Sequence, residues 1–333
     1  MFSRLRTTIL FTLTILVAIL SYGCGERSRY IEINSEALGT FIQVKCNTTL
    51  DSETISNIIQ EVDQESKNSM SIFATNSLLN RINRNETDSL DCHIARNIEL
   101  AHRFSELSDG AYDITIKPLT DAYGFGREEA ENEVNIDSLL EFVGYELLTI
   151  EDGRLCKADN RMEIDLNSIA KGYTVDLVAE RLEALNIEDY MVNIGGEIRC
   201  KGRNAQGESW SIGIETPYDG NMEMDSFERI VHVTDRAVAT SGNYRRFYLT
   251  SEGEKVAHTL DPKSGRSAVS NLLSVTVIAP TCAEADAAAT MLMSLGASHR
   301  AESVAQFCHE EYGWDYYLIF AANEGYHTVG SIE

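Results

Sequence analysis

Hydrophobic and polar residues are arranged along the chain in patterns that predict a mixture of strands and helices. An apolar, β-branched run from Leu272 to Ala279 ends at Pro280, and an alanine-rich segment with high helix propensity follows. Thr281 and Glu284 have the spacing of a capping box, which predicts that the helix begins near Cys282. This part of the chain is therefore expected to form a strand, a turn and a helix.

The rest of the chain carries shorter patterns of both kinds. Helical spacing of apolar residues predicts helices over Ile55–Val62, Asn76–Asn83, His93–Leu107 and Ile169–Leu185, the last capped by Asn167 and Ser168. Strand patterns occur over Tyr30–Asn34, Phe41–Cys46, Met162–Leu166, Tyr190–Ile194, Glu197–Lys201, Ser209–Glu215, Arg229–Thr234 and Ala237–Thr240. Residues 111–126 are too irregular to predict regular structure.

Strands and helices are mixed without a regular βαβ alternation, and several antiparallel runs occur in the second half. The predicted fold class is therefore α+β, a single compact mixed domain with largely antiparallel strands and packed helices. No repeat, low-complexity tract or long linker interrupts residues 30–333, which agrees with one continuous domain.

The composition is that of a globular protein and limits its partners. Of the 333 residues, 43% are hydrophobic, which is ample for a packed core. The 52 acidic and 28 basic residues give a net charge of −24. Nucleic acid is not expected as a partner, because binding its phosphates requires a basic surface. Six cysteines that follow the N-terminal segment lack the spacing of a zinc site. Some could pair in an oxidising compartment, but buried free thiols are more usual in a large domain, and we predict no particular disulfide.

The first 23 residues have the organisation of a bacterial export signal. Arg4 and Arg6 form a basic start, and the apolar run from Thr8 to Leu20 is too short for a comfortable membrane span. Gly23 directly before Cys24 resembles a lipobox, in which the cysteine becomes the lipidated first residue of the mature protein. A lipid anchor at Cys24 is therefore expected.

Residues 1–23 are accordingly predicted to be a lipoprotein signal peptide, residues 24–29 a short tether and residues 30–333 the functional domain. We expect the protein in the bacterial cell envelope, anchored to the inner membrane through its lipid and facing the periplasm. Ordinary signal-peptidase cleavage and an uncleaved anchor are the alternatives, since Tyr22 departs from the small residues usual at this position.

Two residues of the alanine-rich helix suggest a metal site. Asp286 and Thr290 are four residues apart, so a carboxylate and a hydroxyl lie one turn apart on one face. Two hard oxygen ligands on a rigid element suit a magnesium ion that also needs phosphate oxygens and waters to complete its octahedron. A solvated helix face without a metal is the alternative for this pair taken alone.

Other residues are typical of a phosphate-binding site. Lys171 falls in the first turn of a predicted helix, where backbone N–H groups and the helix dipole favour an anion, although it could also be a surface lysine. His258 lies in a turn where it could act as an acid or base, although a lone histidine is more often structural. The Gly195–Gly196 pair either lets the backbone approach a ligand or makes a tight turn. Residues 111–126 form either a ligand-binding loop or a surface loop.

Several segments occur in the order found in one enzyme family. They are Leu38-Gly39-Thr40, Met70 to Phe73, Asn76 to Asn83, Ser108 to Thr115, Pro118-Leu119, Gly124-Phe125-Gly126, Ile164 to Asp176, Asn193 to Gly196, Thr240 to Tyr244, His258 to Gly265 and Ala285 to Thr290. With this series, which spans about residues 30–300, the chain resembles the ApbE-like flavin transferases, also called FAD:protein FMN transferases. The compact α+β fold of that family agrees with the predicted class.

The resemblance implies that FAD binds with Mg²⁺ on its pyrophosphate, and that the FMN half is transferred to a threonine or serine of an acceptor protein with release of AMP. It places the metal ligands at a main-chain oxygen of Ser168, at Asp286 and at the Thr290 hydroxyl. His258 and Asp286 are the implied catalytic residues, with His258 activating the acceptor hydroxyl or assisting the phosphate chemistry. FAD contacts are implied at Leu38, Phe73, Ala111, Tyr112, Asp113, Asp165, Lys171 and Thr259.

The expected acceptors are exported or membrane-bound redox subunits that carry covalent FMN. Four residues depart from the family pattern: Leu38 replaces a methionine, Phe73 replaces a tyrosine, and Asn167-Ser168 replaces a glycine pair. The changes at Leu38 and Phe73 can alter flavin affinity without altering the class of reaction, and Ser168 can still offer its carbonyl. Two alternative functions remain open, a magnesium-dependent FAD pyrophosphatase and a periplasmic flavin-binding lipoprotein without turnover.

Overall fold

The computed structural model of the protein describes residues 29–126, 135–217, 227–242, 247–249, 255–257, 259–267, 270–296, 298–323 and 325–332. The predicted signal peptide, Cys24, most of the predicted tether and His258 lie outside these residues. Within the described ranges, no helix is both long enough and apolar enough to cross a bilayer. The six cysteines that fall in these ranges are free thiols, and four of them are buried.

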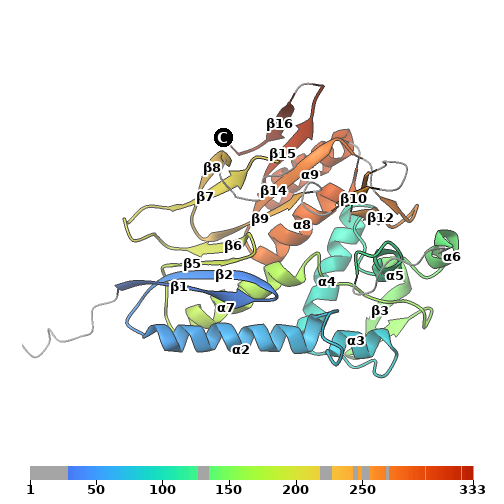
Figure 1. Ribbon diagram of the computed structural model, residues 1–333, viewed down its shortest axis with the longest axis horizontal. Helices are drawn as coiled ribbons and strands as arrows, with labels where there is room; N and C mark the ends of the chain where they lie inside the picture. Colours follow the sequence, from blue (N-terminus) through green and yellow to red (C-terminus); the bar gives the residue numbers. More distant parts are fainter. Residues whose placement is uncertain are drawn as a thin grey trace, which may run out of the picture.

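An eight-stranded sheet forms the centre of the protein (Figure 1). Its order is β1-β2-β5-β6-β9-β14-β15-β16, and every neighbouring pair is antiparallel. The strands are β1 (Arg29–Ala37), β2 (Thr40–Thr48), β5 (Tyr190–Ile194), β6 (Glu197–Lys201), β9 (Arg236–Gly242), β14 (Leu272–Ala279), β15 (Asp315–Ala321) and β16 (Tyr326–Gly330). This sheet confirms the predicted α+β class with antiparallel strands.

Helices pack against one face of the sheet, and a hairpin packs against part of the other (Figure 1). Successive strand residues point to opposite faces, so Val277 joins the core beneath the helices while Ile278 packs with Trp210 of the hairpin. The helices on the sheet are α2 (Ser52–Met70), α7 (Ala170–Ala184), α8 (Cys282–Ser294) and α9 (Ser298–Tyr312). Helices α3 (Leu78–Asn83) and α4 (Cys92–Leu107) pack against these helices. The hairpin consists of β7 (Trp210–Glu215) and β8 (Phe227–Val233).

Short elements connect these layers. Three further two-stranded pairs are antiparallel. The short elements are α5 (Lys117–Ala122), α6 (Ile136–Leu140), the 3₁₀ helix η1 (Tyr145–Leu147), β3 (Leu148–Glu151), β4 (Arg154–Lys157), β10 (Phe247–Leu249), β11 (Lys255–Ala257), β12 (Leu260–Asp261) and β13 (Arg266–Ser267).

The strand predicted over Met162–Leu166 is wrong. This segment makes only one isolated bridge, between Glu163 and Ile116. Loop neighbours and a side chain bond its backbone in place of a strand partner: the Asp165 N–H donates to the Ile114 carbonyl at 2.8 Å, and an asparagine side chain of α3 bonds the backbone of the residue before Asp165.

The prediction that residues 111–126 lack regular structure is also corrected, because they contain helix α5. Pro118 stands in the first turn of α5, where a missing N–H costs nothing and the fixed φ favours a helix. Helix α2 is much longer than the predicted Ile55–Val62, because Asp51 caps it and buried residues continue as far as Met70.

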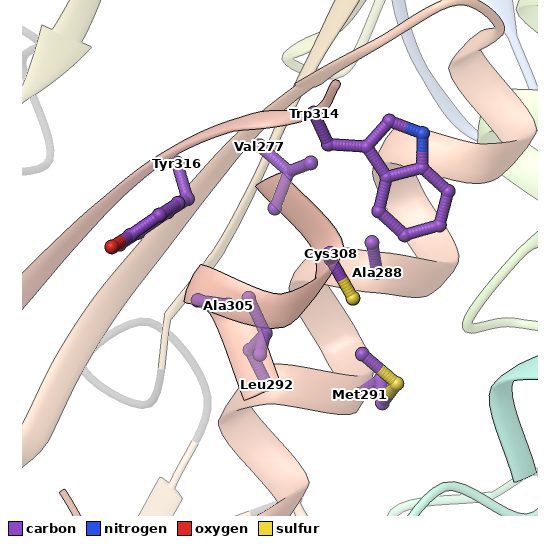
Figure 2. Close-up of a pocket in the computed structure, with 8 residues that line it drawn as sticks. All are labelled: Val277, Ala288, Met291, Leu292, Ala305, Cys308, Trp314 and Tyr316. Carbon is purple, nitrogen blue, oxygen red and sulfur yellow. The ribbon is translucent and has the colours of Figure 1, made fainter. Parts of the chain in front are cut away.

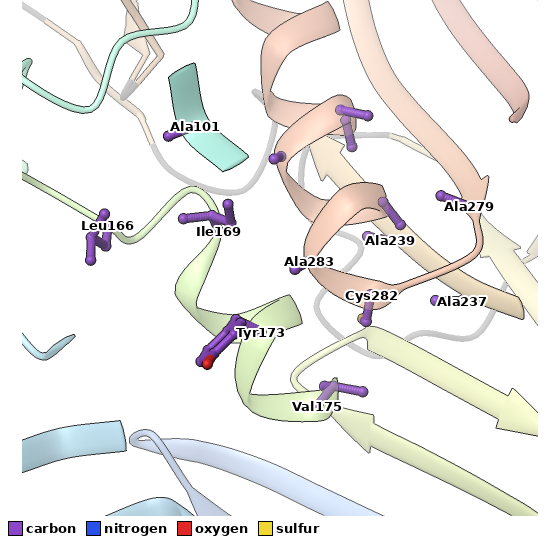
Figure 3. Close-up of a cluster of buried hydrophobic side chains, with 14 of the residues drawn as sticks. Ala101, Leu166, Ile169, Tyr173, Val175, Ala237, Ala239, Ala279, Cys282 and Ala283 are labelled. Atoms are coloured by element: carbon purple, nitrogen blue, oxygen red, sulfur yellow. The ribbon is translucent and has the colours of Figure 1, made fainter. Parts of the chain in front are cut away.

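Helices α7 and α8 lie side by side on the same face of the sheet, α7 over β5 and β6 and α8 over β9 and β14, and small side chains line the contacts of α8. Figure 3 shows Cys282 and Ala283 of α8 near Ala237 and Ala239 of β9. Small side chains allow backbones to approach closely, so α8 is held rigidly against the sheet. On another side of α8, apolar residues surround a cavity of about 10 Å³ (Figure 2): Val277, Ala288, Met291, Leu292, Ala305, Cys308, Trp314 and Tyr316. A gap this small and apolar is a packing defect and not a ligand site.

Candidate functional site

Helix α8 carries Asp286 into the interior of the protein. Thr281 caps the helix as predicted, because its hydroxyl oxygen accepts from the Glu284 N–H at 3.3 Å and donates to Glu284 Oε2 at 3.1 Å. Asp286 follows in the next turn and is only 5% exposed, so the solvated helix face is excluded. One turn further on, Thr290 Oγ1 lies 3.2 Å from Ser241 Oγ of β9.

Helices α7 and α8 each present a carboxylate to the N-terminus of the other. The Gly172 N–H in the first turn of α7 donates to Asp286 Oδ2 at 2.9 Å. The Cys282 and Ala283 N–H groups that open α8 donate to the two oxygens of Asp176 at 2.9 and 2.8 Å. We call these contacts the carboxylate exchange; they satisfy N–H groups that have no intrahelical acceptor. Gly172 permits them, because a Cβ there would lie 2.2 Å from the Cys282 carbonyl oxygen.

The start of α7 corrects the predicted helix cap. Ile169 is the N-cap residue, and no side chain caps the helix from that position. Asn167 instead donates to the Asp165 carboxylate through its N–H and its side-chain amide, and Ser168 Oγ donates to Tyr112 Oη at 2.8 Å. These two residues therefore bond to the neighbouring loop, and the carboxylate from α8 takes the role of the cap.

The three implied metal ligands belong to this helix junction or to the next turn of α8. Ser168 directly precedes the N-cap residue Ile169, so its carbonyl oxygen lies outside the hydrogen-bond series of α7. The Asp286 carboxylate lies at the same helix start, where it accepts from the Gly172 N–H. The Thr290 hydroxyl lies one turn further along α8.

This donor set fits Mg²⁺. Burial, and then the nearby Glu197 carboxylate, raise the pKa of Asp286 to about 8, so the site favours a bound cation that compensates the buried charge. No group of three or more His, Cys, Asp or Glu side chains able to hold a metal occurs among the described residues. One carboxylate with a carbonyl and a hydroxyl leaves positions for phosphate oxygens and water, which is the coordination that Mg²⁺ prefers beside a nucleotide.

Lys171 lies in the first turn of α7, as predicted, but its ammonium has a protein partner. Lys171 Nζ is 2.6 Å from Oε2 of Glu197, the first residue of β6. Burial opposes the ammonium charge, yet attraction to Glu197 and Asp286 outweighs it, so the pKa of Lys171 is raised. Glu197 was not recognised from the sequence, in which its only signal is its position directly after the double glycine.

Buried polar side chains shape the loop after α4. Asp113 Oδ1 accepts from the N–H and the hydroxyl of Thr115 at 2.8 and 2.7 Å, and Oδ2 accepts from the Tyr145 N–H at 2.7 Å. The Asp113 carboxylate is therefore engaged by the protein. Ala111 and Tyr112 are buried beside it, and the Tyr112 hydroxyl points to the start of α7, where it accepts from Ser168.

The remaining implied FAD contacts lie on other elements. Leu38, in the turn between β1 and β2, has a φ of 52° and is held by donation of its N–H to Asp63 Oδ1 at 2.7 Å. Phe73 follows α2 and is 56% exposed, so its ring is available to a ligand. Thr259 lies between β11 and β12 and is partly exposed. His258 lies outside the described residues.

Two buried asparagines of α3 support these loops and were not recognised from the sequence. Asn80 Nδ2 donates to the carbonyls of Ile72 and Ala74 at 2.8 and 2.9 Å, which fixes the turn that carries Phe73. Asn83 accepts from the Ile164 N–H at 2.8 Å and donates to the Ile164 carbonyl at 2.9 Å. A side-chain amide therefore replaces a strand partner directly before Asp165.

Replacing Asn83 by alanine is expected to destabilise the protein by about 2–4 kcal/mol. The change leaves the buried N–H and carbonyl of Ile164 unpaired, at roughly 1–3 kcal/mol each. Chemical denaturation measures the loss. Asn34→Ala, which removes an exposed asparagine of β1, is the control and is expected to cost less than about 0.5 kcal/mol. Equal losses in the two variants would contradict the role given to Asn83.

Comparison with known proteins places this geometry in a family. The sequence model of the ApbE family matches residues 38–312. The chain is 35% identical over 288 residues to a FAD:protein FMN transferase of Vibrio cholerae, a match that covers 84% of this chain and 85% of the relative. It is 33% identical over 335 residues to a FAD:protein FMN transferase of Haemophilus influenzae, with 96% and 94% covered.

Solved structures of ApbE proteins also superpose on this structure. The flavin transferase ApbE from Vibrio cholerae superposes with a TM-score of 0.80 at 31% identity, covering 91% of this chain and 97% of that chain. The ApbE protein from Thermotoga maritima superposes with a TM-score of 0.77 at 27% identity, covering 92% and 97%. The resemblance found in the motifs therefore extends over the whole sheet and its helices.

Proposed function

The chain belongs to the ApbE family, and we propose that it transfers the FMN part of FAD to a threonine or serine hydroxyl of an acceptor protein. The observation that carries the proposal is the buried Asp286 at the N-terminus of α7, beside Lys171. A helix start, a lysine and a carboxylate that favours a cation together suit a pyrophosphate group. The activity named for relatives that cover most of the chain supports the same conclusion.

In the proposed reaction, the acceptor oxygen bonds to the phosphorus of the FMN half as the bond from that phosphorus to the bridging oxygen breaks. AMP leaves with the electron pair of that bond, and the hydroxyl proton passes to a base, for which we propose His258. Lys171 and the positive end of the α7 dipole stabilise the phosphate charge, and the fixed helix junction holds the pyrophosphate in line with the acceptor.

Ser168, Asp286 and Thr290 are proposed to hold Mg²⁺, which when bound supplies charge neutralisation on the pyrophosphate. Removal of the metal with EDTA is expected to lower the rate of AMP release from FAD at least about 100-fold, because several kcal/mol of transition-state stabilisation are lost. Addition of excess MgCl₂ to the same sample is the control and is expected to restore the rate. An unchanged rate in EDTA would contradict the ligand assignment.

We further propose that the protein is a lipoprotein held at the inner membrane through Cys24, with exported or membrane-bound redox subunits as acceptors. The basic start, the short apolar run and the Gly23–Cys24 pair support this location. Mass spectrometry of the mature N-terminus in a membrane fraction tests it. An unmodified N-terminus that begins elsewhere would refute the anchor without affecting the proposed reaction.

Incubation of the purified protein with FAD, MgCl₂ and a threonine-bearing redox subunit tests the proposed reaction. We expect one AMP per FMN added to the acceptor, with the added mass of FMN on a threonine or serine peptide. Free FMN formed whether or not the acceptor is present would indicate a pyrophosphatase instead. A stable FAD complex that never yields AMP would indicate a carrier.

A further inference from the structure

The side of β6 that meets α7 is charged along its whole length. Side chains alternate along the strand, so Ile198 and Cys200 pack toward the β7–β8 hairpin. Glu197, Arg199 and Lys201 point the other way, toward α7. Charged residues seldom face a core unless they are paired, so this side of the strand requires an explanation.

Each of these charges has an opposite partner on α7. We call the row of pairs the β6–α7 ladder, and its members are Glu197–Lys171 at 2.6 Å, Arg199–Asp176 at 2.8 Å, Arg199–Glu183 at 3.3 Å and Lys201–Glu183 at 3.7 Å. The ladder runs from the surface toward the site, since the strand side chains are 31% exposed at Lys201, 18% at Arg199 and 4% at Glu197.

A gain in folding stability does not explain why these charged pairs are present. The attraction in a buried ion pair is largely offset by the cost of removing both charges from water. The charges of β6 run from one acidic to two basic residues, and those of α7 run from one basic to two acidic residues. This complementary order sets the position of α7 along β6, because sliding the helix would separate the opposite charges. The pair Glu197–Lys171 lies at the N-terminal end of α7, next to Gly172.

The double glycine explains how Glu197 reaches that position. Gly195 and Gly196 have φ of 59° and 107° and form the two-residue turn between β5 and β6, in which Ile194 pairs with Glu197. The turn is closed by donation of the Gly196 N–H to Asn193 Oδ1 at 3.0 Å. The pair thus makes a tight turn, and that turn fixes Glu197 at the start of a central strand.

A lysine side chain without a partner samples many rotamers, whereas an ammonium held at 2.6 Å by a carboxylate of a rigid strand does not. One N–H of the ammonium can bond to Glu197 while the other two remain for phosphate oxygens. We propose that Glu197 is a positioning residue that holds the Lys171 ammonium in place for the pyrophosphate of FAD. The inference rests on the proposed function, because FAD must be the ligand.

A double-mutant cycle tests the inference. The quantity measured is the affinity for FAD, in the absence of an acceptor protein. The proteins are the parent, Glu197→Gln, Lys171→Met and the double variant, and the dissociation constant of FAD is measured by flavin fluorescence in MgCl₂. Glu197→Gln is expected to weaken FAD binding about tenfold. Without the Glu197 carboxylate, the Lys171 ammonium is no longer held where it makes a charge-assisted contact with the phosphate. Adding Glu197→Gln to Lys171→Met is expected to change affinity less than about twofold, because Glu197 acts through Lys171.

Lys201→Gln is the matched control, because it removes the outermost pair of the same ladder. It is expected to leave FAD affinity within about twofold of the parent. Additive effects in the cycle, or unchanged affinity in Glu197→Gln, would overturn the inference. If Glu197→Gln does not fold, the FAD affinities of Lys171→Met and of the double variant still test the inference. A weaker affinity in the double variant than in Lys171→Met would overturn it. A parent protein that does not bind FAD would instead refute the proposed function.

Discussion

Asp286→Asn is expected to lower the rate of FMN transfer at least about 1,000-fold while leaving the protein folded. The variant removes the carboxylate proposed to bind Mg²⁺, and the loss of several kcal/mol at the transition state corresponds to this factor. The asparagine oxygen can still accept from the Gly172 N–H, so the contact between α7 and α8 survives. Because the native carboxylate is buried near Glu197, we expect the thermal midpoint of the metal-free variant to equal or exceed that of the parent.

Two measurements on the same samples separate these effects: AMP release from FAD with MgCl₂ and acceptor present, and thermal unfolding without metal. Glu61→Gln, an exposed carboxylate of α2, is the control and is expected to change neither. Release of AMP by Asp286→Asn at the parent rate would show that the metal ligands lie elsewhere. A large fall in the thermal midpoint would show that the charge of Asp286, and not only its oxygen, holds the helices together.

The parts of the fold that the sequence predicts are those determined by neighbouring residues. The run from Leu272 to Ala279 forms a strand as predicted, and Thr281 with Glu284 starts the following helix, because strand alternation and helix capping depend on residues a few positions apart. The segment Met162–Leu166 has the same local pattern, but a buried asparagine of α3 and loop carbonyls bond its backbone instead of a strand.

The features of the candidate site are also of two kinds: residues that sequence patterns identify, and contacts that only the folded structure shows. The spacing of Asp286 and Thr290 identifies one face of a helix, and the motifs add Ser168 and Lys171. The contacts that orient these residues join distant parts of the chain: Gly172 and Asp286 are 114 positions apart. No periodicity reports such a pair. The role of Asp176 and the carboxylate exchange therefore emerge only when α7 and α8 are placed side by side, and the role of Glu197 only when α7 is placed against β6.

Asp176→Ala is expected to lower the free energy of unfolding by about 3–5 kcal/mol, the largest loss of stability that we predict. Asp176 is 5% exposed, and its carboxylate accepts from the first two N–H groups of α8 and from Arg199. The alanine variant removes the shorter of the two ion pairs of the half-buried Arg199, which among the described residues keeps only Glu183 at 3.3 Å, and the N–H groups lose their acceptor as well. Chemical denaturation of the purified protein measures the loss.

Asp159→Ala is the matched control, because Asp159 also pairs with an arginine but does so at the surface, where solvent replaces the contact. It is expected to leave the free energy of unfolding unchanged within error. Asp176→Asn keeps one oxygen for the start of α8 and is expected to fall between the control and the alanine variant. If Asp176→Ala were as stable as the control, apolar packing alone would align α7 with α8. The carboxylate exchange would then be a consequence of that alignment and not its cause.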